Sequence, residues 1–101
     1  MKKAVKVVYN NCHGGFGLSD EAIRRISDRK GYEVSWLSFM SAEMRMDKDL
    51  VAVVEELGEA ANDDFSDLRI KEVTEDFLFD DYDGYETIIP KSHLKFTKIN
   101  I

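Results

Sequence analysis

Residues 4–21 read AVKVVYNNCHGGFGLSDE, and this stretch determines how the fold begins. Its first six residues are short, β-branched and nearly continuous in apolar character, which predicts a strand and favours a central position over an edge. Three glycines within residues 14–17 give the following loop a backbone freedom that other residues lack. Ser19 is the expected N-cap of a helix whose first turn is acidic, as the positive end of the helix dipole favours. We therefore predict a unit of strand, glycine-rich turn and helix.

Two helices are expected. Apolar residues at helical spacing predict one near residues 20–30 and another near residues 48–61. Gly58 either ends the second helix or is tolerated inside it. The segment between the helices is either a short strand or an irregular segment that buries Trp36 and Phe39.

Strands dominate the second half of the chain, after a break at residues 62–64. Residues 68–73 alternate in hydropathy and predict a strand. Asp83-Gly84 between two strand-like runs is a strong hairpin signal. A two-residue turn sets three cross-strand pairs, which are Tyr82 with Tyr85, Asp80 with Thr87, and Phe79 with Ile88.

The tail, residues 94–101, is expected to add an edge strand whose lysines discourage further pairing. The order β-α-(β)-α-β-β-β predicts an α+β fold with a mostly antiparallel sheet. At 101 residues the chain is expected to form a single domain, residues 1–101.

The net charge of −6 is unevenly distributed. Residues 1–31 carry seven basic residues (Lys and Arg) and three acidic residues. Residues 32–90 carry four basic and seventeen acidic residues, and residues 91–101 carry three basic residues and no acidic residue. This acidic middle argues against direct nucleic-acid binding, which needs a dominant basic face. It is either a solvated surface or a face that docks on a basic partner, in the manner of a nucleic-acid mimic.

Cysteine content and hydropathy indicate the compartment. The single cysteine, Cys12, excludes an internal disulfide and a cysteine-only zinc site. Its free thiol fits a reducing compartment. The N-terminal apolar run is too short for a signal peptide, and no stretch approaches the roughly 20 apolar residues that cross a bilayer. We therefore expect a cytoplasmic protein without membrane contact.

The glycine-rich turn is the leading candidate site. A strand that leads through glycines to a helix N-terminus can cradle a phosphate, although the turn lacks the Walker and dinucleotide-binding motifs. A basic side chain, from this chain or from a second subunit of a homo-oligomer, would have to offset the acidic first helical turn. The alternative is a tight turn that only lets strand and helix pack closely. The predicted contacts of a small anionic or nucleotide-like ligand are Asn10, Gly14, Gly15, Phe16, Gly17, Ser19, Arg45, Arg69, Tyr82 and Tyr85.

Catalytic and metal-binding signals are weak. Cys12 and His13 are adjacent and point to opposite sides of an extended segment, so Cys–His catalysis would need Cys12 beside His93. Carboxylates around the hairpin could hold a divalent cation or act as an acid–base pair, but charges at a hairpin tip are usually solvated. We predict a non-enzymatic protein with no catalytic residue, metal or cofactor.

Three blocks also occur together in a known group of proteins. These are VVYNNCHGGFGLSDEA at residues 7–22, LVAVVEELG at residues 50–58 and YDGYE at residues 82–86. They resemble a family of small, mostly uncharacterised proteins common in bacteriophage genomes. Relatives often end in a short His-Arg-aromatic run, whereas this chain has HLKF at residues 93–96.

The resemblance implies an accessory phage protein, and such proteins often counter host defences. We therefore expect a protein of the host cytosol that sequesters a nucleotide-like signalling ligand near the glycine-rich turn. The alternative is an acidic inhibitor that occupies a basic host defence protein.

Overall fold

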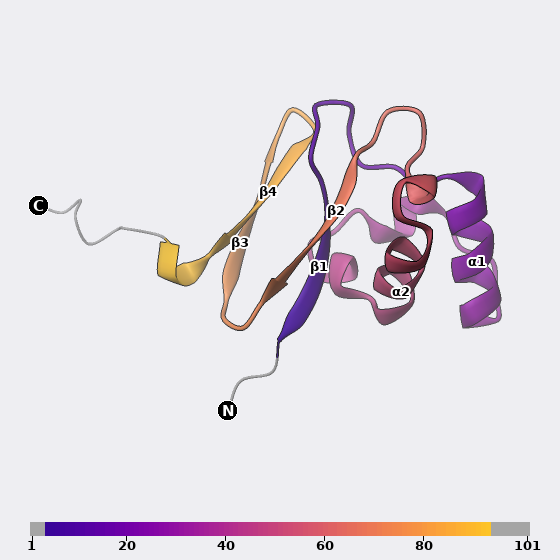
Figure 1. The fold of residues 1–101 in the computed structure, drawn as a ribbon, viewed down its shortest axis with the longest axis horizontal. Helices are drawn as coiled ribbons and strands as arrows, with labels where there is room; N and C mark the ends of the chain where they lie inside the picture. Colours follow the sequence, from indigo (N-terminus) through magenta and orange to yellow (C-terminus); the bar gives the residue numbers. More distant parts are fainter. Residues whose placement is uncertain (1–3, 94–101) are drawn as a thin grey trace, which may run out of the picture.

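The computed structural model describes residues 4–93, which have an α+β fold (Figure 1). The two helices and the strands follow the predicted order, apart from the segment between the helices. The elements are β1 (Val5–Asn10), α1 (Asp20–Lys30), α2 (Lys48–Leu57), β2 (Leu68–Val73), β3 (Phe77–Tyr82) and β4 (Tyr85–Pro90).

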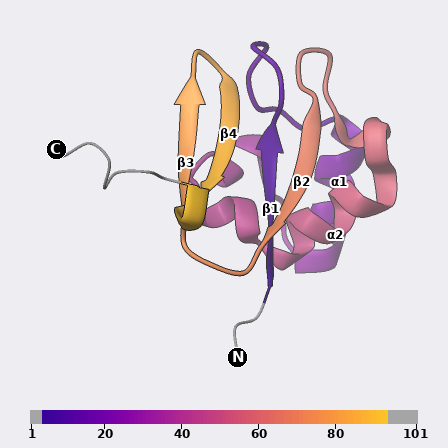
Figure 2. The same ribbon diagram turned by 60° about the vertical axis from the view of Figure 1, so that its left-hand side comes forward.

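The strands form two antiparallel pairs, β1 with β2 and β3 with β4. In the first pair Val5 lies opposite Val73 and Asn10 opposite Leu68. Strand β4 lies along the other side of β1, so the spatial order is β3, β4, β1, β2 (Figure 2). Strand β1 is therefore flanked on both sides, as predicted, but within the described residues it makes a strand ladder only with β2.

The helices cover one face of β1 and β2 (Figures 1 and 2). Their apolar side chains form the main core together with Val8 and Phe16. Because successive strand residues point to opposite faces, Val7 belongs instead to a smaller cluster with Val73 and Ile88. The nearly continuous apolar sequence of β1 thus reflects burial on both faces.

The hairpin forms at the predicted turn. Asp83 and Gly84 have φ values of 53° and 88°, as both central residues of a type I′ turn require. The three predicted cross-strand pairs are confirmed. A Cβ on Gly84 would lie 3.0 Å from the carbonyl oxygen of His13, so this glycine also lets the turn approach the glycine-rich loop.

The segment between the helices contains no strand, which resolves that ambiguity in favour of an irregular segment. Residues 36–39 and 43–46 form 3-10 turns, the first of which is capped by the Ser35 hydroxyl. Phe39 is fully buried as expected, but the expected burial of Trp36 is wrong, since this residue stays 39% exposed.

The second helix is shorter than residues 48–61. Gly58 has a φ of 58° and ends α2, and a 3-10 turn continues the chain from Gly58 to Ala61. The edge strand predicted for residues 94–101 lies outside the described residues. Each helix in the described part is too short or too polar to span a membrane.

Candidate functional site

Three segments meet at one end of the molecule, shown at the top of Figure 1. They are the glycine-rich loop (residues 10–17), the α2–β2 loop (residues 62–67) and the hairpin turn (residues 82–85). We call this end of the molecule the loop end. It contains seven of the ten residues predicted to contact a ligand.

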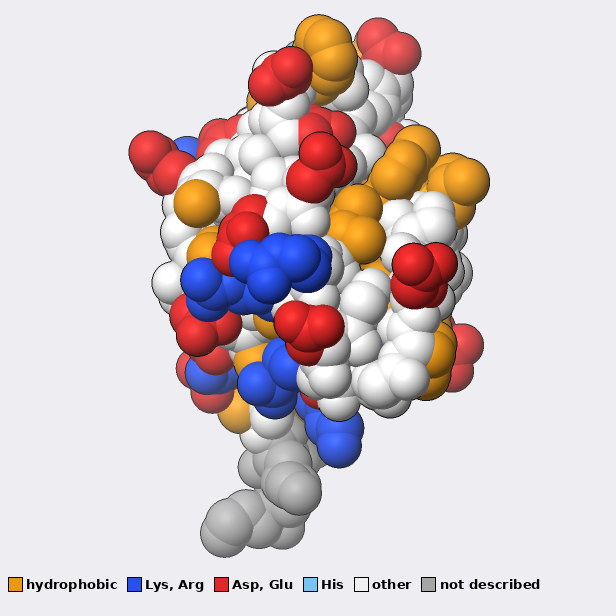
Figure 3. Space-filling model, turned by 90° about the vertical axis from the view of Figure 1, so that its right-hand side faces the viewer, with side chains coloured by type: hydrophobic (Ala, Val, Ile, Leu, Met, Phe, Trp, Pro, Cys, Tyr) orange, Lys and Arg blue, Asp and Glu red, His pale blue; other side chains and the backbone are white. Residues whose placement is uncertain are grey.

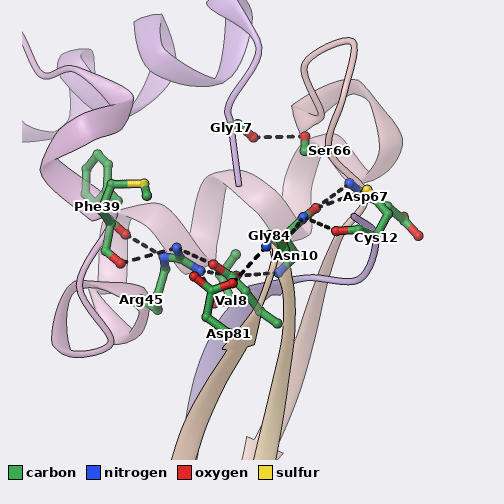
Figure 4. Close-up of polar contacts among 12 residues, drawn as sticks. Val8, Asn10, Cys12, Gly17, Phe39, Arg45, Ser66, Asp67, Asp81 and Gly84 are labelled. Atoms are coloured by element: carbon green, nitrogen blue, oxygen red, sulfur yellow. Dashed lines mark hydrogen bonds and ion pairs between the residues drawn. The ribbon is translucent and has the colours of Figure 1, made fainter. Parts of the chain in front are cut away.

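Asn10, at the end of β1, joins the three segments. Its buried side-chain amide donates hydrogen bonds to the carbonyls of Cys12 (2.7 Å) and Gly84 (2.9 Å) (Figure 4). Its side-chain oxygen accepts a hydrogen bond from the backbone N–H of Asp67 at 2.7 Å. This predicted site residue is therefore central to the loop end, but its side-chain polar atoms form hydrogen bonds with backbone groups of the protein itself.

The glycines allow the first two loops to pack directly against each other. A Cβ on Gly14 would lie 1.9 Å from the carbonyl oxygen of Phe65, and a Cβ on Gly17 would lie 1.9 Å from the carboxylate of Asp63. The Ser66 hydroxyl donates a hydrogen bond to the Gly17 carbonyl (3.0 Å, Figure 4). Close packing therefore accounts for these two glycines without a ligand.

The helix N-terminus next to the loop is also occupied. The Ser19 hydroxyl accepts a hydrogen bond from the Ala22 N–H (3.1 Å), which confirms the predicted cap, and donates to the Ala60 carbonyl (2.7 Å). Phe16 is buried in the main core. The geometry around Ser19 thus anchors α1 to the segment that follows α2.

Arg45 lies fully buried next to Phe16, with its guanidinium carbon 3.7 Å from the ring centroid. It forms a bidentate ion pair with the buried carboxylate of Glu86, in which one of the two contacts is 2.9 Å long. It also donates hydrogen bonds to the carbonyls of Phe39 and Met40 (Figure 4). Sequence reasoning placed Arg45 near the glycine-rich loop, but its charge is compensated inside the protein.

Of the other predicted contacts, Arg69 and Tyr82 are exposed, whereas Gly15 and Tyr85 are half-buried. Arg69 is exposed and paired with Asp67 at 3.1 Å. The pKa of Arg69 is raised, chiefly by its hydrogen bond with Asp67. The His13 ring lies 5.0 Å from the Tyr85 ring and 6.2 Å from the Tyr82 ring. These aromatic rings form one side of the loop end.

Phe65 is the surface residue that sequence reasoning missed. It is 70% exposed, at the tip of the α2–β2 loop, and Tyr82 in the neighbouring turn is 72% exposed. Figure 3 shows a hydrophobic side chain between acidic ones at this end of the molecule. An aromatic residue within the acidic run Asp63–Asp67 was the available signal, because an isolated apolar group in a polar loop has no core to join.

Two open hollows of the surface lie away from the glycine-rich loop. One of about 450 Å³ lies at the β2–β3 turn, and another of about 450 Å³ lies beside α1. Neither is lined by a residue of the range 10–17.

The hairpin carboxylates do not converge. Glu86 faces Arg45 in the interior, whereas Asp80 is exposed on the opposite face of the hairpin. Within the described part of the chain, no three His, Cys, Asp or Glu side chains could hold a metal ion together. The Cys12 thiol donates a hydrogen bond to the Phe65 carbonyl at 3.1 Å. The side chain of His93 lies outside what the structure describes, so its pairing with Cys12 stays a prediction.

Comparisons with known proteins give no functional assignment. No protein-family model matches the chain, and searches of the curated proteins and of the solved structures found no match. The functional argument therefore depends on the geometry of the loop end.

Proposed function

We propose that this chain is a non-enzymatic binding protein that docks a basic partner protein on its loop end. The observation that carries the proposal is the exposure of Phe65 and Tyr82, at 70% and 72%, beside acidic side chains. Aromatic anchors supply much of the binding energy at protein interfaces, and complementary charge steers the encounter.

The acidic side chains at this end are available to a partner. Asp64 and Asp83 at this end, and Asp80 in the adjoining strand β3, are exposed and form no ion pair with a described cation. On α1, in contrast, Arg24 and Arg25 both pair with Glu21 at 2.7 Å. Figure 3 shows a band of basic side chains with acidic ones around it on the side of the molecule where α1 lies. Charges along α1 therefore largely cancel one another, whereas the exposed aspartates of the hairpin and the α2–β2 loop give this part of the surface a net negative charge.

A nucleotide-like ligand at the glycine-rich turn is the function that the sequence favoured, and it is the second candidate function here. The turn packs against residues 63–65, and the Arg45 charge is compensated by Glu86, so the geometry favours it less. It stays a prediction with a direct test. Denaturing the purified protein and analysing the released small molecules by mass spectrometry would support it if about one nucleotide were released per chain.

The resemblance to phage proteins extends the proposal to a partner and a compartment. The basic partner is then a host defence protein in the cytosol, and binding blocks its action. Mimicry of nucleic acid is the form that this inhibition takes if the partner normally binds phosphates.

Capture from a bacterial lysate tests the docking surface. The chain and two double variants are immobilised, Phe65→Ser with Tyr82→Ser at the loop end and Tyr32→Ser with Leu37→Ser as a control at similarly exposed apolar positions elsewhere. We expect a basic protein bound by the wild type and the control, and a loss of about tenfold or more for the loop-end variant. Binding should also weaken at about 0.5 M salt. Equal capture by all three proteins would contradict the proposal.

A further inference from the structure

We infer that the basic partner is bound as an added β-strand along the open edge of β3, an inference that rests on the function proposed for the loop end. Strand β3 pairs with β4 on one side. Within residues 4–93 no strand pairs with its other side, which is the outer edge of the strand order in Figure 2. An edge strand offers a row of free N–H and C=O groups that an extended peptide can bind.

The hairpin register shows which backbone groups are free. In a two-residue turn the flanking pair, Tyr82 and Tyr85, exchanges hydrogen bonds, and bonded pairs then alternate along the ladder. Phe77 lies opposite Pro90, at a non-bonded position of this alternation, which suits a proline because it has no N–H. The N–H and C=O groups of Phe77, Phe79 and Asp81 therefore point away from β4, to the open edge.

Charge decides which strand fits there. Natural edge strands often carry lysine or proline that discourages pairing, and β3, with the sequence FLFDDY, has neither. Asp80 and Asp81 are both exposed in its second half. An antiparallel second copy of β3 would bring these carboxylates close to their equivalents, which is destabilising. A strand that carries Lys or Arg gains from the same carboxylates.

Apolar contacts on the outer face of the hairpin define the rest of the partner segment. Leu78, Asp80 and Tyr82 alternate with the inward residues and share this face. Leu78 is 51% exposed and Tyr82 is 72% exposed. A strand that alternates apolar and basic residues can therefore match both the apolar and the acidic positions of β3. Tyr82 also belongs to the loop end, so the two surfaces are continuous.

Amide hydrogen exchange measured by NMR tests this mode of binding in the full chain. The probe is a synthetic peptide of about eight residues that alternates valine and lysine, and its control carries N-methyl groups on alternate residues. We expect exchange at Phe77, Phe79 and Asp81 to slow by about tenfold or more, with little change at Leu78 and Asp80, which already donate to β4. The N-methylated peptide should give no protection, because it cannot complete the ladder.

A matched pair of charge variants adds a second measurement. Asp80→Asn should weaken peptide binding several-fold, whereas Asp28→Asn on α1 should leave it unchanged. Peptide binding with changes only at residues 62–67 and 82–85 would overturn the strand addition and leave the loop-end function standing. Binding that occurs only after removal of residues 94–101 would mean that the chain's own C-terminal segment blocks the edge, and would also overturn the inference. If the peptide binds neither the full chain nor the chain without residues 94–101, the strand addition is also overturned. The lysate experiment would then still test the loop-end function.

Discussion

Glu86 and Arg45 each bind one backbone group on the edge of β1 that faces β4. The Glu86 carboxylate accepts a hydrogen bond from the Asn10 N–H at 2.8 Å, and the Arg45 guanidinium reaches the Val8 carbonyl at 3.5 Å. Residues 8 and 10 of a strand point their backbone groups to the same side. The buried ion pair thus joins the hairpin to β1 where a ladder between β1 and β4 would otherwise run.

Separating this ion pair should destabilise the protein strongly. Arg45→Met leaves the Glu86 carboxylate buried without its cation, and we expect a loss of about 3–5 kcal/mol in the free energy of unfolding, measured with urea. Glu86→Met should cost a similar amount. The double variant should be more stable than the sum of the two losses predicts, because neither charge is then left alone. Strictly additive losses would contradict the pairing.

The two close glycine contacts should respond differently to alanine. Gly14→Ala places a methyl group against the Phe65 backbone carbonyl, whereas Gly17→Ala places it against the Asp63 side chain. We expect Gly14→Ala to cost about 1–3 kcal/mol and Gly17→Ala to cost less, because a side chain can rotate away. Adding Asp63→Ala should reduce the cost of Gly17→Ala, and Phe65→Ala should not rescue Gly14→Ala, whose clash is with backbone. Thermal unfolding of these four variants, with Asp63→Ala and Phe65→Ala alone as references, checks this order.

The hairpin turn should tolerate asparagine at residue 83 but not valine at residue 84. Gly84→Val puts a β-branched residue at a φ of 88°, 3.0 Å from the His13 carbonyl, and should cost about 1–3 kcal/mol. Asp83→Asn is the matched control, because asparagine adopts positive φ readily. We expect the control to change stability by less than about 0.5 kcal/mol. A similar loss in both variants would show that the positive φ at residue 84 is not the cause.

Acid should weaken the contact between the end of α1 and the start of α2. The Lys30 ammonium donates hydrogen bonds to Asp47 and Asp49, both at 2.9 Å. Its hydrogen bond holds the pKa of the Asp49 carboxyl below its ordinary value, although burial acts in the opposite direction. The stabilisation is therefore present above the unfolded pKa of about 3.9 and is lost as the pH falls through the lower folded value.

Asp49→Asn measures this contribution. We expect the variant to be less stable than the wild type by about 1 kcal/mol near neutral pH. The difference should shrink as the pH is lowered from about 5 to about 2, because the wild-type carboxylate becomes protonated. Denaturant unfolding across this range gives the difference directly, and Asp28→Asn, at an exposed carboxylate of α1, is the control. A difference that does not change with pH would contradict the role of the charge.

Local chemistry made the elements predictable. Ser19 caps α1 through its hydroxyl, and Asp83-Gly84 makes the turn because both residues adopt positive φ. Each signal acts over a few residues and needs no distant partner. Trp36 was placed wrongly because an aromatic side chain indicates burial only on average, and the 3-10 turn around it buries Phe39 instead.

The candidate site was predictable only in part. The sequence placed Asn10, Arg45 and Tyr82 together, but not the roles that they have. Phe65 contacts the glycine-rich loop although about fifty residues of sequence separate them. No local sequence pattern predicts this contact.

The sequence by itself determined the helices, the strands, the hairpin register and the uneven charge, because periodicity, caps and turn residues act locally. Only the tertiary structure decided that Arg45 faces Glu86 and that β4 lies beside β1 without a ladder. It also decided which acidic and aromatic side chains share the loop end. The physical reason is that buried charges must find partners wherever the chain brings them. Those partners here come from residues 41 positions apart.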